Sequence, residues 1–160
     1  MSQAREGVVV VGGGILGTMH AVFAVRAGAT VVHLDRHRHA RETSVRNFGR
    51  LLVSGRPAGA ELALALRARE LWAQVGRDVP ATGFWPNGSV TVVSSEAELK
   101  VLEAAVAALR RRAGPVVARC REVRRLNPGL RGEFLAGLHC SRDAAVESSH
   151  ATCSDPCGSG

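Results

Sequence analysis

Three glycines and one acid are the residues of this chain best suited to holding a ligand. The glycines follow the spacing Gly12-x-Gly14-x-x-Gly17, and the acid is Asp35. In such a turn the first glycine permits a tight bend, the second lets backbone amides approach a pyrophosphate, and the third allows close helix–strand packing. The acid can accept hydrogen bonds from both ribose hydroxyls of an adenosine. The pattern favours dinucleotide binding over a ligand-free turn, although its spacing does not distinguish NAD(P) from FAD.

The elements that must position these residues are a strand, a helix and a second strand. Residues 8–11 are four consecutive valines next to glycines, a run too short for a helix and typical of a buried parallel strand. A helix is predicted from Ile15, with apolar residues at helical spacing up to a stop at Gly28. Residues 30–34 predict a second buried strand that ends at Asp35. Together these elements predict a β-α-β unit.

The rest of the chain alternates helices, strands and turns, without an internal repeat. Residues 36–58 are polar, Arg-rich and irregular, and the helix after them is expected to place Leu64 and Val75 on one apolar face. Ser95 and Glu98 have the spacing of a capping box at a helix start. The further predicted elements are helices at 59–75, 95–112 and 122–126, and strands at 89–93, 116–118 and 137–140, the last of them an edge strand.

Composition and charge exclude several classes of protein. The chain of 160 residues has a formal net charge of +7, yet Lys100 is its only lysine and it has no tyrosine. A Tyr-x-x-x-Lys dehydrogenase dyad and a Gly-Lys-Ser/Thr phosphate loop are therefore excluded. Without a recognition motif or an aromatic platform, we interpret the arginine clusters as surface charge rather than a nucleic-acid site. These clusters are residues 36–41, residues 110–112, and Arg119 with Arg121, Arg124 and Arg125.

The histidines and cysteines do not predict a metal site. His139, Cys140, His150, Cys153 and Cys157 could together bind zinc, but no Cys-x-x-Cys pair is present, and chance thiols are the simpler account. His33, His37 and His39 are interpreted as packed or solvated imidazoles. No signal peptide or membrane-spanning run is recognisable, so we expect a cytoplasmic protein without a membrane partner and with reduced thiols.

Several segments resemble one family of flavoenzymes. They are Ser44-Val45-Arg46-Asn47-Phe48-Gly49, the N-terminal pattern Val-Val-Val-Val-Gly-Gly-Gly-Ile-Leu-Gly with Asp35-Arg36, the Gly88-Ser89 strand, and the run from Pro128 to Gly137-Leu138-His139. Over residues 7–147 the chain resembles the FAD-dependent oxidoreductases of the D-amino-acid oxidase and glycine oxidase superfamily. Asp35 stands where that family more often has glutamate.

The resemblance implies FAD as cofactor and an amino acid or amine as substrate, whose C–N bond is oxidised by hydride transfer to the flavin. By position, Gly12, Gly14 and Gly17, with Ile15 beside them, would hold the FAD pyrophosphate, Asp35 the adenosine ribose, and Arg36 would flank the adenosine. Ser44, Asn47, Phe48 and Gly49 would lie beside the pyrophosphate or the flavin, although plain loop chemistry also accounts for Ser44 and Asn47. No catalytic residue and no oligomeric state is predicted.

The implied fold is α/β: an incomplete Rossmann-like FAD-binding β-α-β unit with parts of an interleaved α+β substrate domain. We expect an FAD-binding unit with its flavin-side loop at 1–58, a substrate or cap region at 59–147, and a disordered tail at 148–160. Family members are far longer, so an incomplete member that is inactive alone is expected. The alternatives are a non-catalytic or inactive dinucleotide-binding fragment and an NAD(P)-linked dehydrogenase.

Overall fold

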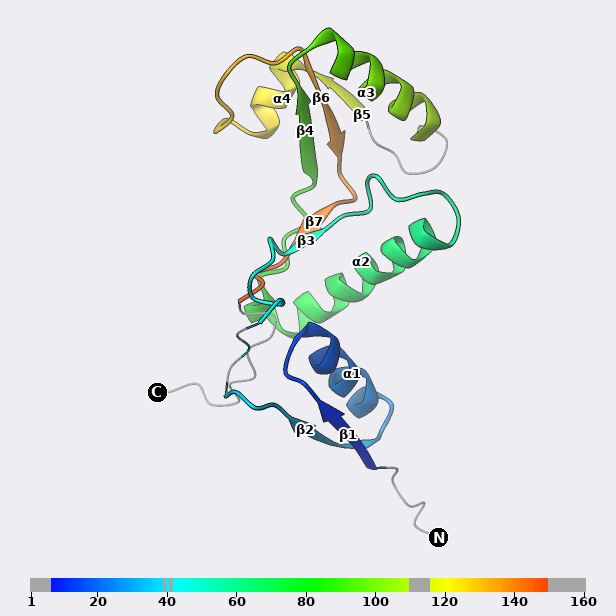
Figure 1. Ribbon diagram of the computed structural model, residues 1–160, viewed down its shortest axis with the longest axis vertical. Coiled ribbons are helices and arrows are strands. Elements are labelled where there is room, and N and C mark those ends of the chain that lie inside the picture. The colour runs from blue at the N-terminus through cyan, green and yellow to red at the C-terminus, as the bar shows by residue number, and fades with distance from the viewer. Residues whose placement is uncertain (1–6, 39, 41, 110–115, 150–160) are drawn as a thin grey trace. The chain divides into compact units, whose positions relative to one another are not determined.

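The computed structural model describes residues 7–38, 40, 42–109 and 116–149 (Figure 1). The chain forms two compact units, which are described separately below. The first consists of Met1–Gly49, Ala81–Gly83 and Glu147–Gly160, and the second of Arg50–Pro80 and Phe84–Val146. Most of the expected tail, at 150–160, and the expected helix end at Arg112 lie outside the described residues.

The first unit contains the predicted β-α-β arrangement. Strand β1 (Gly7–Val11) pairs in parallel with β2 (Thr30–Leu34), and helix α1 (Ile15–Arg26) connects them. The register runs from Gly7 opposite Thr30 to Val11 opposite Leu34. The predicted helix start at Ile15 and the stop near Gly28 are confirmed. This order places the glycine turn at the carboxyl end of β1, which is where open parallel sheets bind ligands.

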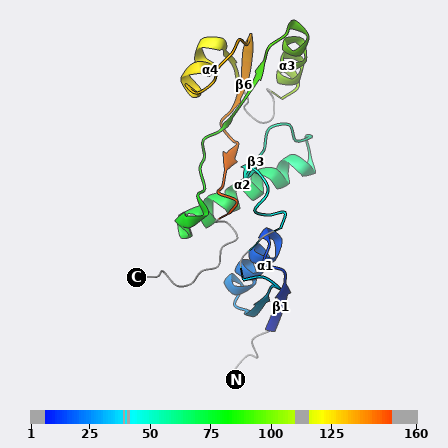
Figure 2. The same ribbon diagram turned by 60° about the vertical axis from the view of Figure 1, so that its left-hand side comes forward.

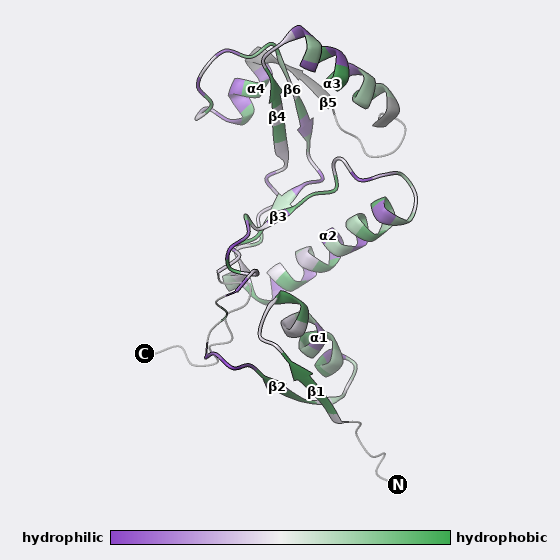
Figure 3. Ribbon diagram, in the orientation of Figure 1, coloured by the Kyte–Doolittle hydropathy of each residue, from purple (hydrophilic) through white to green (hydrophobic). Residues whose placement is uncertain are grey.

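The prediction that both strands are buried is wrong for the described residues. Val9 is 63% exposed, Val11 81%, Val32 51% and Leu34 50%, although both strands are strongly hydrophobic (Figure 3). The burial of β1 alternates, with every second side chain more exposed than its neighbours. One helix can cover only one face of a two-stranded sheet, so the side chains of the other face stay in solvent.

In the second unit, a short ribbon interrupts the segment expected to be irregular. Strand β3 (Arg50–Leu51) pairs antiparallel with β7 (Ala144–Ala145), and Trp85 forms an isolated bridge to Ala145. Two-residue strands are too short to show an alternating pattern, so no local pattern predicts them. The pairing brings residues from distant parts of the chain side by side, with Arg50 opposite Ala145 and Leu51 opposite Ala144.

A three-stranded sheet forms the other part of the second unit. Strands β4 (Ser89–Val93), β6 (Ala136–Cys140) and β5 (Val116–Arg119) lie in the order β4-β6-β5, and both pairings are antiparallel. The predicted strand at 137–140 is therefore confirmed, but its assignment to an edge is wrong. It occupies the centre because both neighbours pair with it, which no local sequence pattern reveals.

Two helices cover opposite faces of this sheet (Figure 2). On one face, Leu102 of α3 (Glu96–Leu109) packs against Val93 and Ala136. On the other, Val123 of α4 (Cys120–Leu126) clusters with Phe134, Val90 and Val92. The alternation of Val92 and Val93 between the two clusters follows from the two-residue period of a strand.

The capping box predicted before α3 is confirmed. The amide of Glu98 donates to Ser95 Oγ over 3.2 Å, and a carboxylate oxygen of Glu98 accepts from the amides of Ser94 (2.7 Å) and Ser95 (3.2 Å). These amide hydrogen bonds lower the pKa of Glu98. The box therefore pairs helix-start amides that no helical carbonyl can reach.

Helix α2 (Ala60–Asp78) buries Val75 as expected but not Leu64, and a 3-10 turn (Pro80–Thr82) follows it. Its buried side chains are Leu62 and Val75, and Leu62 packs against Val53. Leu64, predicted on the apolar face, is 69% exposed. The contact with Val53 selects Leu62 for burial, and Leu64 lies two positions away, where a helix turns by about 200°.

A buried carboxylate connects the two strand systems of the second unit. Asp143 is 1% exposed, and its Oδ1 accepts from the amides of Val53 (2.7 Å) and Ser54 (2.9 Å). Its Oδ2 accepts from the hydroxyls of Ser54 and Ser89, the latter over 2.5 Å. We call these four residues the Asp143 network. The network joins the chain after β3 to the start of β4. Because each carboxylate oxygen accepts two hydrogen bonds, the buried charge of Asp143 is fully hydrogen-bonded.

Candidate functional site

The glycine turn between β1 and α1 requires two of its glycines for steric reasons. Gly12 has φ of 115°, a backbone conformation that side-chain-bearing residues rarely adopt. A Cβ added to Gly17 would lie 1.8 Å from the carbonyl oxygen of Gly12. The backbone of α1 thus approaches the turn as closely as it can. This close approach is the one that the spacing Gly12-x-Gly14-x-x-Gly17 predicts.

Asp35 lies directly after β2 and is hydrogen-bonded to the glycine turn. Its Oδ2 accepts from the amide of Gly13 over 2.6 Å, and its Oδ1 accepts from the amide of His37 over 2.6 Å. The hydrogen bond from Gly13, followed by that from His37, lowers the pKa of Asp35 below its usual range. The carboxylate is exposed and ionised, and each of its oxygens has a second lone pair. It can therefore still accept hydrogen bonds from hydroxyl groups of a ligand.

Ser44 comes from a distant loop to the N-terminus of α1. Its Oγ accepts from the amide of Ile15 over 2.9 Å, and a Cβ on Gly14 would lie 3.1 Å from that oxygen. The N-cap, Gly14, has no side chain to cap the helix, and the first turn of α1 has no acidic residue. No side chain of α1 itself offsets the positive end of the helix dipole, and the nearest negative charge is Asp35 on the amide of Gly13, so this end of the helix favours an anion.

The loop after Ser44 is held by Asn47. The Nδ2 of Asn47 donates to the carbonyl oxygen of Ser44 over 2.6 Å, and its Oδ1 accepts from the amide of Gly49 over 2.6 Å. Phe48 between them is 88% exposed. Arg36 forms an exposed ion pair with Glu42 at 2.8 Å. The structure thus brings Asp35, Ser44 and the glycines together at one turn, and the charge of Arg36 acts on the carboxylate of Asp35.

His33 also contacts this turn, although no sequence motif predicts it. The Nε2 of His33, on β2, lies 2.8 Å from the carbonyl oxygen of Gly12. A carbonyl only accepts, so Nε2 carries the proton and donates. The sequence predicts only a packed or solvated imidazole at this position, so the hydrogen bond is a finding of the structure. It adds a side-chain contact between β2 and the first glycine.

The residues present fit a dinucleotide. The turn offers backbone amides at a helix N-terminus, the hydroxyl of Ser44, and space that a Cβ on the glycines would fill. The carboxylate of Asp35 lies at the end of the next strand. In the described part of the chain, no three His, Cys, Asp or Glu side chains gather as they would around a metal ion. Of the residues weighed and set aside as a zinc site, Cys140 is a buried free thiol, and residues 150–157 lie outside the described residues.

None of the described helices combines the length and the apolar character needed to cross a bilayer.

Comparison with known proteins identifies relatives for nearly the whole chain. A family model described as FAD dependent oxidoreductase matches residues 7–154. No curated protein matches the sequence. Among solved structures, glycine oxidase from Geobacillus kaustophilus has a TM-score of 0.79 and 17% identity, and covers 94% of this chain and 43% of its own. L-amino acid deaminase from Proteus vulgaris has a TM-score of 0.76 and 21% identity. That match covers 95% of this chain and 36% of the deaminase chain.

A third solved structure, L-proline dehydrogenase from P. horikoshii, has a TM-score of 0.77 and 19% identity, and covers 95% of this chain and 40% of its own. The chain thus spans less than half the length of these three relatives. At such low identity the structures support the α/β, Rossmann-like fold rather than a shared activity. The family model, which matches most of the sequence, shows that the chain belongs to the FAD-dependent oxidoreductase family.

Proposed function

We propose that this chain binds FAD at the glycine turn between β1 and α1. The pyrophosphate would lie against the amides at the N-terminus of α1, beside Gly14, Ile15 and the hydroxyl of Ser44. The carboxylate of Asp35 would accept the hydroxyls of the adenosine ribose. The observation that carries the proposal is that Asp35 and Ser44, far apart in the sequence, are both hydrogen-bonded to this one turn.

Each group at the turn has a separate task. The turn amides and the dipole of α1 supply positive potential for the phosphates. Ser44 accepts from Ile15, so its own hydroxyl proton remains to be donated to a phosphate oxygen. Asn47 orients the loop that carries Ser44, and Gly12 and Gly17 keep side chains out of the turn. Arg36 and Phe48 would flank the cofactor from the loop side.

The reaction we infer is the oxidation of a C–N bond in an amino acid or amine. FAD, when bound, would supply the acceptor for the hydride. The names of the relatives, glycine oxidase, L-amino acid deaminase and L-proline dehydrogenase, support this substrate class. These relatives are more than twice as long as the chain. We therefore propose that the substrate site needs protein beyond these 160 residues.

The test is a titration of the 160-residue chain with FAD, ADP and NAD. Flavin fluorescence measures the binding of FAD, and calorimetry measures the binding of all three. We expect saturable binding of FAD and ADP, and weaker binding by Ser44→Ala. The matched control, Ser95→Ala, changes a serine in the other unit and should bind like the wild type. Binding of none of the three nucleotides would refute the proposal, and binding of NAD in preference to FAD would favour the dehydrogenase alternative.

The pH dependence of binding tests the role of Asp35. Its pKa is lowered in the folded chain, so the carboxylate stays ionised as the pH falls through the usual range for aspartate. The difference in ADP affinity between the wild type and Asp35→Asn should therefore persist through that range and shrink only as the pH passes through the lowered pKa, whereas the ionisations of ADP itself act equally on both. Asp35→Asn should bind more weakly and without this acid dependence.

A further inference from the structure

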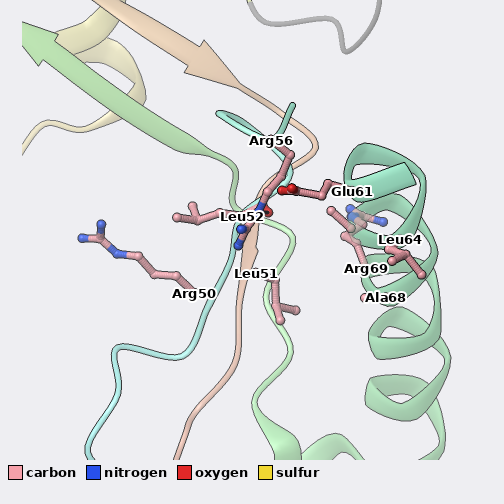
Figure 4. A pocket seen from close by; sticks show the side chains of 9 residues that line it. Arg50, Leu51, Leu52, Arg56, Glu61, Leu64, Ala68 and Arg69 are labelled. Carbon is pink, nitrogen blue, oxygen red and sulfur yellow. Dashed lines mark hydrogen bonds between the residues drawn. The ribbon is translucent and has the colours of Figure 1, made fainter. Parts of the chain in front are cut away.

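The second unit contains a pocket of about 360 Å³ between one face of α2 and a wall formed by β3 and the chain that follows it (Figure 4). This volume is within the range of small-molecule sites. The wall from α2 follows helical spacing, so its side chains share a face. The lining residues are Arg50, Leu51, Leu52 and Arg56 from β3 and the chain after it, and Glu61, Leu64, Ala65, Ala68 and Arg69 from the helix.

The charged groups of this pocket form a specific pattern. In Figure 4, Arg56 and Glu61 point toward one another, Arg69 lies further along α2, and Arg50 extends away from the helix. Two guanidinium groups and one carboxylate therefore face the space between the walls. Its apolar surface includes Leu64, which is 69% exposed.

The charges of Arg56, Glu61 and Arg69 are available to a ligand. Among the described residues, no ion pair joins Glu61 to Arg56 or Arg69. The hydrogen bonds of both arginines use Nε, from Arg56 to the carbonyl oxygen of Leu52 (3.4 Å) and from Arg69 to that of Arg142 (3.2 Å). The terminal nitrogens of each guanidinium can therefore donate to a carboxylate.

The position of these groups is held by buried structure. Asp143 binds the amides of Val53 and Ser54, which lie between the lining residues Leu52 and Arg56. The neighbouring carbonyl of Arg142 accepts from Arg69, whose guanidinium also lies 5.8 Å from the ring centre of Phe84. One short segment, 142–143, therefore ties both walls of the pocket to each other, which limits the rearrangement that binding would require.

We propose that this pocket binds a small amino acid that carries a second acidic group. Two carboxylates of such a molecule match the two guanidinium groups, its ammonium group matches Glu61, and its methylene groups match the leucine and alanine side chains. A simple carboxylate leaves Glu61 unmatched, and a neutral amino acid leaves one arginine unmatched. The site concerns binding alone and stands whether or not the chain binds FAD.

The test is an NMR titration of the 15N-labelled 160-residue chain at constant salt. The ligands are L- and D-glutamate, glutarate, which lacks the ammonium group, and alanine, which lacks the second acid. We expect saturable shifts in the amides of 51–56 and 61–69 with at least one enantiomer of glutamate, and weaker binding of alanine. Arg56→Gln should weaken glutamate binding about fivefold, as expected for an exposed ion pair. Thermal melts of each variant establish that it is folded.

The variant Glu61→Gln distinguishes the proposal from general attraction to a basic protein. It should weaken glutamate binding about threefold, because it removes the attraction between the Glu61 carboxylate and the ammonium group of glutamate. It should strengthen glutarate binding by a similar factor, because it removes the repulsion between Glu61 and the carboxylates of glutarate. Arg67→Gln, on the same helix but outside the pocket and paired with Glu70 at 3.2 Å, is the matched control and should change neither affinity. The absence of saturable shifts, an equal effect of Arg67→Gln, or a same-sign effect of Glu61→Gln would each overturn the proposal.

Discussion

Replacing Asp143 with alanine should destabilise the second unit more than any surface substitution. The change removes the acceptor of four hydrogen bonds, from the amides of Val53 and Ser54 and the hydroxyls of Ser54 and Ser89. Val53 is only 1% exposed, so water cannot replace the lost partner of its amide without a rearrangement. Asp143→Ala therefore leaves buried donors unpaired.

The magnitude follows from these donors. A buried donor left without an acceptor costs about 1–3 kcal/mol, and breaking a buried charged network costs about 3–5 kcal/mol. We expect Asp143→Ala to lower the free energy of unfolding by about 4 kcal/mol. In Asp143→Asn one oxygen can still accept from the two amides, and the new NH2 group can donate to the two hydroxyls after they rotate. A smaller loss, about 1–2 kcal/mol, is expected for that variant.

The assay is urea unfolding followed by tryptophan fluorescence. Both tryptophans, Trp72 and Trp85, belong to the second unit and report on it directly. Ser89→Ala removes one donor of the network, should cost about 1 kcal/mol, and remains measurable if Asp143→Ala does not fold. The matched control is Asp35→Asn, the same chemical change at an exposed carboxylate of the other unit, which should leave this transition unchanged.

The pH dependence gives an independent check. Burial acts to raise the pKa of Asp143, but the hydrogen bonds from the Ser54 and Ser89 hydroxyls and from the amides of Ser54 and Val53 outweigh it, so the pKa is lowered. The stability that this group contributes is therefore present above its unfolded pKa, about 3.9, and is lost as the pH falls through the folded value. The difference between the wild type and Asp143→Asn should shrink in that acid range. A difference below about 0.5 kcal/mol at neutral pH, or one that grows on acidification, would refute the reasoning.

Two further substitutions test the steric arguments. Gly17→Ala places a Cβ against the carbonyl of Gly12 and should abolish ADP binding measured by calorimetry, whereas Gly7→Ala, with no atom within 4 Å of its added Cβ, should bind normally. Val123→Ala empties a fully buried site and should lower the free energy of unfolding by about 2 kcal/mol, measured by urea titration. Val101→Ala, at a side chain that is 70% exposed, should change it by less than about 0.5 kcal/mol, and equal effects of the two would contradict the packing described for α4.

Local signals predicted most of the elements. The valine run, the glycine turn and the helix from Ile15 are determined by residues that are neighbours in the chain, as is the capping box of Ser95 and Glu98. The sequence also predicted the chemistry of the candidate site, because the glycine spacing indicates where the backbone must come close to a ligand. The domain boundaries at 58 and 147, the role of each site residue and the cytoplasmic location stay predictions.

Tertiary structure decided which surfaces are buried and which distant residues meet. Strand β6 became the centre of its sheet, and Leu62 rather than Leu64 became the buried residue of α2, because pairing and packing partners lie far away in the chain. The hydrogen bonds of Ser44 to Ile15, of His33 to Gly12 and of Asp143 to Val53 span 29, 21 and 90 positions. Propensity and periodicity act over a few residues, so contacts of this range arise only when the chain has folded.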